Sequence, residues 1–139
     1  MKRNASAIWN GGLKDGKGTI STDSGVLENT QYSFSTRFEE GKGTNPEELI
    51  GAAHVGCFSM FLPALLTQAG FTPTRVHTTA TVHLGEGPTI TLIELDTEAE
   101  VPQVSEAAFL EQAEAAKKNC PVSKALAGPE IRLRARLKA

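Results

Sequence analysis

The chain has little of what marks a disulfide-stabilised or a nucleic-acid-binding protein. Only 2 of its 139 residues are cysteine, too few to cross-link a domain of this size. Lys and Arg number 14 and Asp and Glu 16, so the formal net charge is −2. A chain so close to neutrality has no general electrostatic attraction to nucleic acid or to an acidic membrane. We therefore expect no nucleic-acid partner.

Several catalytic motifs are missing as well. The glycine-rich segments at residues 11–12 and 16–18 have neither the GxxxxGK[ST] nor the GxGxxG spacing of a nucleotide-binding loop. There is no GxSxG turn of a serine hydrolase. The first residues contain no apolar signal core, so we expect a cytoplasmic protein. A separation of 63 residues between Cys57 and Cys120 excludes a CxxC redox motif.

One long uncharged segment raises the possibility of a membrane span. Residues 49–66 carry no formal charge over 18 residues, the minimum for a spanning helix. The segment contains His54 and Pro63, and Glu47 and Glu48 precede it where a basic or aromatic anchor would be expected. We interpret it as the buried central helix of a soluble protein, with no membrane association.

The remaining sequence is typical of one globular domain over residues 1–139. It is 40% hydrophobic and 22% charged. Alternating apolar and polar residues predict early strands at residues 5–10, 18–22 and 31–38. Later strands are predicted at residues 75–84, 89–101 and 131–138, with a β-bulge near Leu92 and Ile93, where the alternation changes phase. Helices are predicted at residues 105–118 and 122–127. The fold class is α+β with antiparallel sheets.

The central helix has a clear start and stop. Asn45 suits the cap, Pro46 the first helical position and Glu47 the first turn, while Gly70 ends the helix. Apolar residues occupy every face between positions 49 and 66, and such a helix is buried on all sides. A monomer of 139 residues offers few elements to surround it. We infer that a partner subunit covers one side.

The two cysteines are the sharpest candidates for chemistry. Cys57 lies in the middle of this helix, either as a small core hydrophobe or as a reactive thiolate. A thiolate there needs a nearby cation, because the helix N-terminus is about 18 Å away. Cys120 precedes Pro121 and so falls at the N-cap of the last short helix, where free N–H groups stabilise a thiolate. The alternative is a small residue that merely precedes a proline.

Other candidates have ordinary interpretations beside functional ones. His54 shares a helix face with Cys57, so the two could be a pair of metal ligands or a base–nucleophile pair. The ordinary interpretation is that His54 is a core histidine. A metal would need further ligands from Cys120, His77 or His83, and no closely spaced second pair exists. Arg37 has the ordinary interpretation of a solvated arginine. The basic residues on the last strand form a solvated face rather than an anion site, given the acidic overall balance: Arg132, Arg134, Arg136 and Lys138.

Several segments together resemble the OsmC/Ohr family of thiol-dependent hydroperoxide peroxidases, in particular its osmotically inducible branch. They are residues 16–22 (GKGTIST), 23–62 (with TNPEELIGAAH and CFSM), 69–74 (AGFTPT) and 119–126 (NCPVSKAL). The resemblance runs essentially from end to end. It implies an intertwined homodimer in which antiparallel sheets wrap around long central helices, with active sites at the subunit interface. That agrees with the partner inferred above for the central helix.

The resemblance also implies roles for four residues. Cys57 matches the family's peroxidatic cysteine and Cys120 its resolving cysteine, while Arg37 and Glu47 match its catalytic arginine and glutamate. The implied reaction reduces organic hydroperoxides, and less well hydrogen peroxide, in oxidative or osmotic stress. A Cys57 sulfenic acid condenses with Cys120, and an external dithiol or a lipoylated protein reduces the disulfide. No bound cofactor or metal is expected.

Geometry limits how Glu47 can act. On a straight helix it would lie about 15 Å from Cys57. We expect an Arg37–Glu47 ion pair that holds the guanidinium over the Cys57 sulfur, from the same chain or across a dimer. Candidates for an apolar pocket around the Cys57 sulfur, or simply for core, are Phe34, Phe38, Phe58, Met60 and Phe61. Two other functions stay open, a non-catalytic dimeric binding module and a metal-binding thiol protein.

Overall fold

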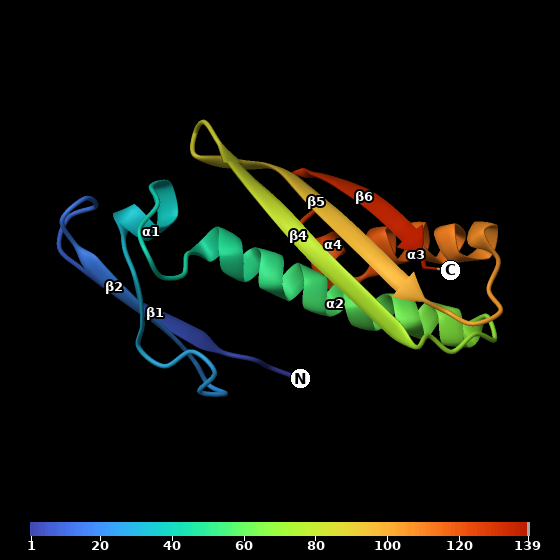
Figure 1. The fold of residues 1–139 in the computed structure, drawn as a ribbon. Coiled ribbons are helices and arrows are strands. Elements are labelled where there is room, and N and C mark those ends of the chain that lie inside the picture. The colour runs from blue at the N-terminus through green and yellow to red at the C-terminus, as the bar shows by residue number, and fades with distance from the viewer. Residues whose placement is uncertain (139) are drawn as a thin grey trace. The chain divides into compact units, whose positions relative to one another are not determined.

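A computed structural model describes residues 1–138. Figure 1 shows its elements, which follow in chain order: β1 (Ala5–Asn10), β2 (Lys17–Thr22), β3 (Thr30–Tyr32), α1 (Phe34–Phe38), α2 (Pro46–Gln68), β4 (Arg75–Gly85), β5 (Thr89–Glu100), α3 (Glu106–Asn119), α4 (Pro121–Ala125) and β6 (Glu130–Leu137). The chain divides into two compact units, Met1–Leu49 and Ile50–Ala139. A single domain over residues 1–139 stays a prediction.

The first unit contains the antiparallel sheet β1-β2-β3. Gly18 of β2 lies opposite both Trp9 and Tyr32, whose ring centroids are 5.4 Å apart. A Cβ at Gly18 would come within 2.5 Å of the Trp9 ring and 2.6 Å of the Tyr32 ring. The two aromatic rings therefore close over this position because it has no side chain.

The predicted strand over residues 31–38 is wrong beyond Tyr32. Helix α1 begins after Ser33, whose side chain accepts a hydrogen bond from the Thr36 backbone N–H while the Thr36 hydroxyl accepts from the Ser33 N–H. This capping box favours a helix locally. The alternation also places Phe34 and Phe38 four residues apart, and their rings meet at 5.0 Å between centroids. Over so short a segment the spacing of the apolar residues could not distinguish a strand, with its period of two, from a single helical turn.

Helix α2 begins and ends where the sequence predicts. The Asn45 Oδ1 accepts a hydrogen bond from the Glu48 backbone N–H at 2.7 Å, and Gly70 after the helix has φ = +95°. By length and composition α2 is the one helix in residues 1–138 that meets the criteria for a membrane span. Within one chain only 28% of its most apolar window is buried. A partner subunit over the remainder stays a prediction.

The second unit contains the sheet β4-β5-β6. Strands β4 and β5 pair antiparallel over their whole length. Their register shifts where His83 pairs with Leu92 and Leu84 pairs with Ile90, which leaves Thr91 as the extra residue of β5. The irregularity at Thr91 adjoins the bulge predicted near Leu92 and Ile93, so the phase change in the sequence located it to within two residues.

Strand β6 departs from the predicted antiparallel arrangement. It runs parallel to β5, from Leu92 opposite Glu130 to Ala99 opposite Leu137. The chain between these strands passes through α3 and α4, and such a helical crossover brings the next strand back in the same direction. The predicted helices therefore already implied a parallel pair.

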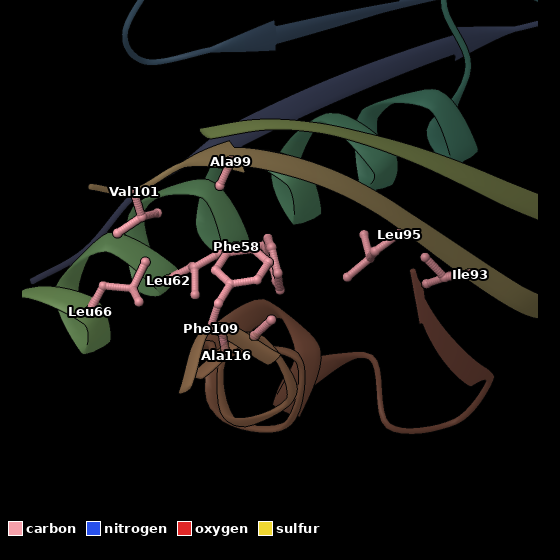
Figure 2. Packing of buried hydrophobic residues seen from close by; sticks show 10 residues of the cluster. Phe58, Leu62, Leu66, Ile93, Leu95, Ala99, Val101, Phe109 and Ala116 are labelled. Atoms are coloured by element: carbon pink, nitrogen blue, oxygen red, sulfur yellow. The ribbon is translucent and has the colours of Figure 1, made fainter. Parts of the chain in front are cut away.

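The hydrophobic core of this unit lies between β5 and the helices α2 and α3 (Figure 2). Helix α2 contributes a stripe at every fourth residue, Phe58, Leu62 and Leu66, and all three are fully buried. Phe109 of α3 and Leu95 of β5 are buried against the same cluster. The stripe continues one turn earlier to a buried polar residue, His54.

Candidate functional site

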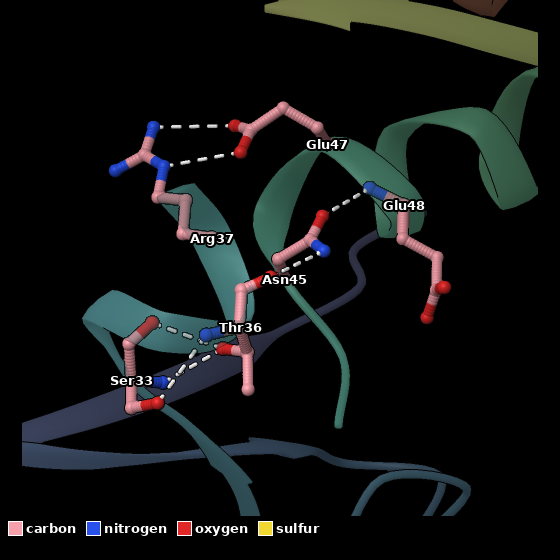
Figure 3. A network of polar contacts seen from close by, with 6 residues as sticks. All are labelled: Ser33, Thr36, Arg37, Asn45, Glu47 and Glu48. Carbon is pink, nitrogen blue, oxygen red and sulfur yellow. Dashed lines mark hydrogen bonds and ion pairs between the residues drawn. The ribbon is translucent and has the colours of Figure 1, made fainter. Parts of the chain in front are cut away.

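The first unit holds an arginine and a glutamate in a two-pronged ion pair. The Arg37 Nε donates to Glu47 Oε1 at 3.1 Å, and Arg37 Nη2 donates to Glu47 Oε2 at 3.2 Å. The Glu47 side chain is 9% exposed and that of Arg37 is 38% exposed. This fork geometry fixes the guanidinium plane. Figure 3 shows the third nitrogen of Arg37 pointing away from the carboxylate, where it is free to meet an anion or a polar oxygen.

Local structure fixes both partners of this pair. Arg37 lies in the last turn of α1, which the Ser33–Thr36 capping box starts. Glu47 lies in the first turn of α2. Asn45 joins the two helices, because its Nδ2 donates to the Thr36 carbonyl at 2.8 Å while its Oδ1 caps α2 (Figure 3). The predicted Arg37–Glu47 ion pair is therefore present.

A cavity of about 230 Å³ lies beside Arg37 in the same unit. Its apolar lining includes Trp9, Leu13, Phe34 and Phe38. Phe34 and Phe38 therefore line a cavity beside Arg37, whereas a pocket around the Cys57 sulfur stays a prediction. Of the other candidates, Phe58 is core, Phe61 packs against the core and Met60 is 78% exposed on one chain.

The second unit brings the two cysteines together. Cys57 lies in α2 and Cys120 lies at the N-cap of α4, and both are free thiols. Cys120 is fully buried, whereas Cys57 is only half-buried. The predicted N-cap position is confirmed, since the Cys120 Sγ accepts a hydrogen bond from the Ser123 backbone N–H at 3.4 Å.

The surroundings of Cys57 work against its ionisation. Burial raises the pKa of the Cys57 thiol, and a hydrogen bond from the Val122 backbone partly opposes that rise. The neighbouring Cys120 thiol raises the pKa further. A reactive thiolate at Cys57 therefore needs a cation, as the sequence indicates.

A buried chain of polar side chains leads from α2 to Cys120. The His54 Nε2 lies 2.7 Å from the Ser123 Oγ, which lies 3.1 Å from the Cys120 Sγ. Desolvation by burial lowers the pKa of His54, so its ring is neutral. Sequence reasoning left His54 open and missed Ser123. The sequence signal for Ser123 was its spacing of three residues from Cys120, because the residue at the N3 position of a helix lies next to the N-cap residue.

The remaining candidates lie apart from these clusters. Within residues 1–138 no group of three or more His, Cys, Asp or Glu side chains is arranged to hold a metal ion. His77 and His83 lie on the exposed face of β4, and His83 contacts Glu94. The basic face of β6 is confirmed as solvated, with Arg136 paired to Asp96 across the strands.

The chain is similar to known proteins over its whole length. The family model described as OsmC-like protein matches residues 39–134. The chain is 51% identical over 142 residues to the Peroxiredoxin OsmC of Escherichia coli (strain K12), an alignment that covers 100% of this chain and 99% of the relative.

Two solved structures share the fold at low identity. An OsmC-like protein from Mycoplasma pneumoniae superposes with a TM-score of 0.76 at 19% identity, covering 100% of this chain and 99% of that one. The organic hydroperoxide resistance protein OhrB of Bacillus subtilis superposes with a TM-score of 0.62 at 22% identity, covering 97% and 98%. The α+β fold is thus that of the OsmC/Ohr proteins. The family model and the full-length relative together establish that the chain belongs to the OsmC family.

Proposed function

We propose that the protein is a cytoplasmic, thiol-dependent peroxidase that reduces organic hydroperoxides, and less well hydrogen peroxide, in oxidative or osmotic stress defence. The observation that carries this proposal is a pair of adjacent free thiols, Cys57 and Cys120, in a chain 51% identical over its length to a peroxiredoxin. A second support is the pre-formed Arg37–Glu47 pair beside an apolar cavity.

The reaction needs only thiol chemistry. The Cys57 thiolate attacks the outer peroxide oxygen, the O–O bond breaks, and the alkoxide leaves as the alcohol after taking up a proton. Cys57 is then a sulfenic acid. The Cys120 sulfur attacks the Cys57 sulfur, the S–O bond breaks, and water leaves. An external dithiol, free or carried on a lipoylated protein, reduces the resulting disulfide by exchange. No bound metal or cofactor enters this cycle.

In this mechanism Arg37 supplies the cation that Cys57 lacks. A guanidinium next to the sulfur offsets the desolvation that raises the pKa of Cys57, and its N–H groups stabilise charge on the leaving oxygen. Glu47 holds the guanidinium plane in place. The cavity next to Arg37 accepts the apolar part of the substrate, which favours alkyl hydroperoxides over hydrogen peroxide.

The Arg37–Glu47 pair in each site comes from a second copy of the chain. On a straight helix Glu47 and Cys57 would be separated by about 15 Å of rise, which is why we assign the pair to a second copy. An exposed stripe of small and apolar residues runs along α2: Ala53, Gly56, Met60 and Ala64. Such a stripe suits close contact with another helix. The exposed stripe supports the part of this proposal in which the protein is a homodimer with two shared sites.

Steady-state turnover tests this function. Purified protein is given cumene hydroperoxide and a dithiol, dihydrolipoamide or dithiothreitol, and peroxide loss is followed. We expect turnover by the wild type, none by Cys57→Ser, and strongly reduced turnover by Cys120→Ser. Ser59→Ala, also on α2, is the matched control and keeps its activity. A wild type that turns over no hydroperoxide with either dithiol contradicts the proposal and favours the non-catalytic dimeric binding module.

A further inference from the structure

His54 is a buried polar residue whose position the core does not explain. It occupies the turn of α2 before Phe58, in the stripe that otherwise supplies hydrophobic side chains. Its one hydrogen-bond partner in residues 1–138 is the Ser123 Oγ at 2.7 Å, from a residue 69 positions later in the chain. Its second ring nitrogen, Nδ1, is buried with no partner in that part of the chain. The protonation of the His54 ring therefore decides whether the Ser123 hydroxyl accepts or donates the hydrogen bond between them.

The unpartnered nitrogen fixes which way the hydrogen bonds run. A neutral histidine carries one N–H, on Nδ1 or on Nε2. A proton on Nδ1 would leave a buried donor unpaired, and buried unpaired N–H groups are rarer than unpaired acceptors. The proton therefore resides on Nε2, which donates to the Ser123 Oγ. The Ser123 hydroxyl then has its own hydrogen left to donate, and the Cys120 Sγ lies within reach as its acceptor at 3.1 Å.

One serine thus directs two donors at one sulfur. The Ser123 hydroxyl and the Ser123 backbone N–H, at 3.4 Å, both point to the Cys120 Sγ. Hydrogen bonds to a charged acceptor are stronger than those to a neutral one, so this arrangement stabilises developing negative charge on that sulfur. It also fixes the sulfur next to Cys57.

We propose that Ser123, oriented by His54, is a positioning residue for the resolving cysteine Cys120, and that it accelerates both formation and reduction of the Cys57–Cys120 disulfide. This inference rests on the proposed peroxidase function. During formation Cys120 attacks the Cys57 sulfenic acid, the S–S bond forms, the S–O bond breaks, and the Cys120 thiol proton leaves with the hydroxide as water.

During reduction one thiolate of an external dithiol attacks Cys57, the more exposed of the two sulfurs, so that a mixed disulfide forms as the Cys57–Cys120 bond breaks. Cys120 departs as a thiolate that the two Ser123 donors stabilise, and it then takes up a proton. The second thiol of the dithiol then displaces Cys57, which is released as a free thiol. Loss of the hydroxyl should therefore slow both steps, although neither step involves the peroxide O–O bond.

Single-turnover kinetics separate this role from a merely structural one. Reduced protein is mixed with one equivalent of cumene hydroperoxide, and cumyl alcohol and intramolecular disulfide are quantified over time. We expect Ser123→Ala to release alcohol at the wild-type rate and to form the disulfide about tenfold more slowly, with a sulfenic acid that dimedone traps. Equal slowing of both steps, or of neither, overturns the proposal.

Two histidine variants test the second link. His54→Leu lacks the donor and should slow disulfide formation as Ser123→Ala does. His54→Gln retains an amide N–H donor and should recover much of the rate. His77→Gln, on the exposed face of β4, is the matched control and stays at the wild-type rate. If leucine and glutamine behave alike, His54 does not act through its donor.

Two measurements are independent of peroxidase activity. The disulfide is made with diamide and reduced with dithiothreitol, and Ser123→Ala should slow that reduction about tenfold. Nitrogen-15 NMR of the His54 ring should show a protonated Nε2 and an unprotonated Nδ1. Unchanged reduction or the opposite tautomer overturns the inference. A wild type that makes no alcohol, while both measurements come out as expected, overturns the peroxidase proposal alone.

Discussion

At the residue scale, Arg37 is placed to do what a lysine cannot. Its Nε and Nη2 are both used by Glu47, so the guanidinium is fixed as a plane while its third nitrogen stays available. A lysine keeps the charge and loses the fork. The charge and the geometry of this residue can therefore be separated by two substitutions.

Arg37→Lys should lower kcat/KM for cumene hydroperoxide about 10²-fold, because an aligned donor to the leaving oxygen is lost. It should leave the pH midpoint of Cys57 alkylation nearly unchanged.

Arg37→Met should lower kcat/KM and also raise the pH midpoint of Cys57 alkylation, because nothing then offsets the burial that raises the pKa of Cys57. Iodoacetamide alkylation of Cys120→Ser protein measures the midpoint. Arg132→Met, on exposed β6, is the control, and a midpoint that does not respond to Arg37→Met would rule out this role.

His54 should make the fold sensitive to mild acid. Burial lowers its pKa in the folded state below 6.5, so the unfolded chain binds the proton more readily. The free energy of unfolding should therefore fall as pH drops below 6.5, by at most about 1.4 kcal/mol per pH unit until the folded-state pKa is reached. Urea unfolding between pH 5 and pH 8 measures this slope. In His54→Gln the slope should flatten, whereas in His77→Gln it should persist; equal slopes in all three proteins would contradict this assignment.

At the element scale, the helices were predictable because their end signals are local. Asn45 and Gly70 mark α2, Ser105 caps α3 and Cys120 precedes Pro121 at the start of α4. Helix α1 was missed, since Ser33 and Thr36 form a capping box inside a segment whose aromatic residues also alternate. The direction of β6 was missed because it depends on the crossover through α3 and α4, which alternation within a strand does not report.

Asn45 tests the link between α1 and α2. Asn45→Ala removes the cap of α2 and the hydrogen bond to the Thr36 carbonyl, so we expect a loss of about 1–2 kcal/mol in the free energy of unfolding. Thr44→Ala removes only an exposed hydrogen bond to Glu48 and should cost less than about 0.5 kcal/mol. Urea denaturation compares them. Equal losses would show that the Asn45 contacts carry no special weight.

At the scale of the whole molecule, the exposed stripe on α2 is the feature that a second copy should cover. Met60→Glu places a charge in its centre and should convert dimer to monomer, as measured by light scattering after size-exclusion chromatography. Leu110→Glu, at a partly exposed position on α3, is the matched control and should remain a dimer. A wild-type monomer, or a Met60→Glu dimer as stable as the wild type, would contradict the proposed dimer.

The site was predictable in part. The roles of the two thiols, Arg37 and Glu47 followed from the family resemblance of their segments, and the Arg37–Glu47 ion pair expected on that basis is present. The hydrogen bond between His54 and Ser123 was not predictable, because it joins side chains of α2 and α4 that are 69 positions apart in the sequence. Periodicity within one element carries no information about such a contact.

The most direct measurement is the product balance of one turnover. Reduced protein receives one equivalent of cumene hydroperoxide without added dithiol, cumyl alcohol is quantified, and peptide mass spectrometry identifies the disulfide. We expect one molecule of alcohol per chain and a Cys57–Cys120 disulfide, with neither product in Cys57→Ser. Intact peroxide together with two free thiols, or alcohol formed equally by Cys57→Ser, would contradict it.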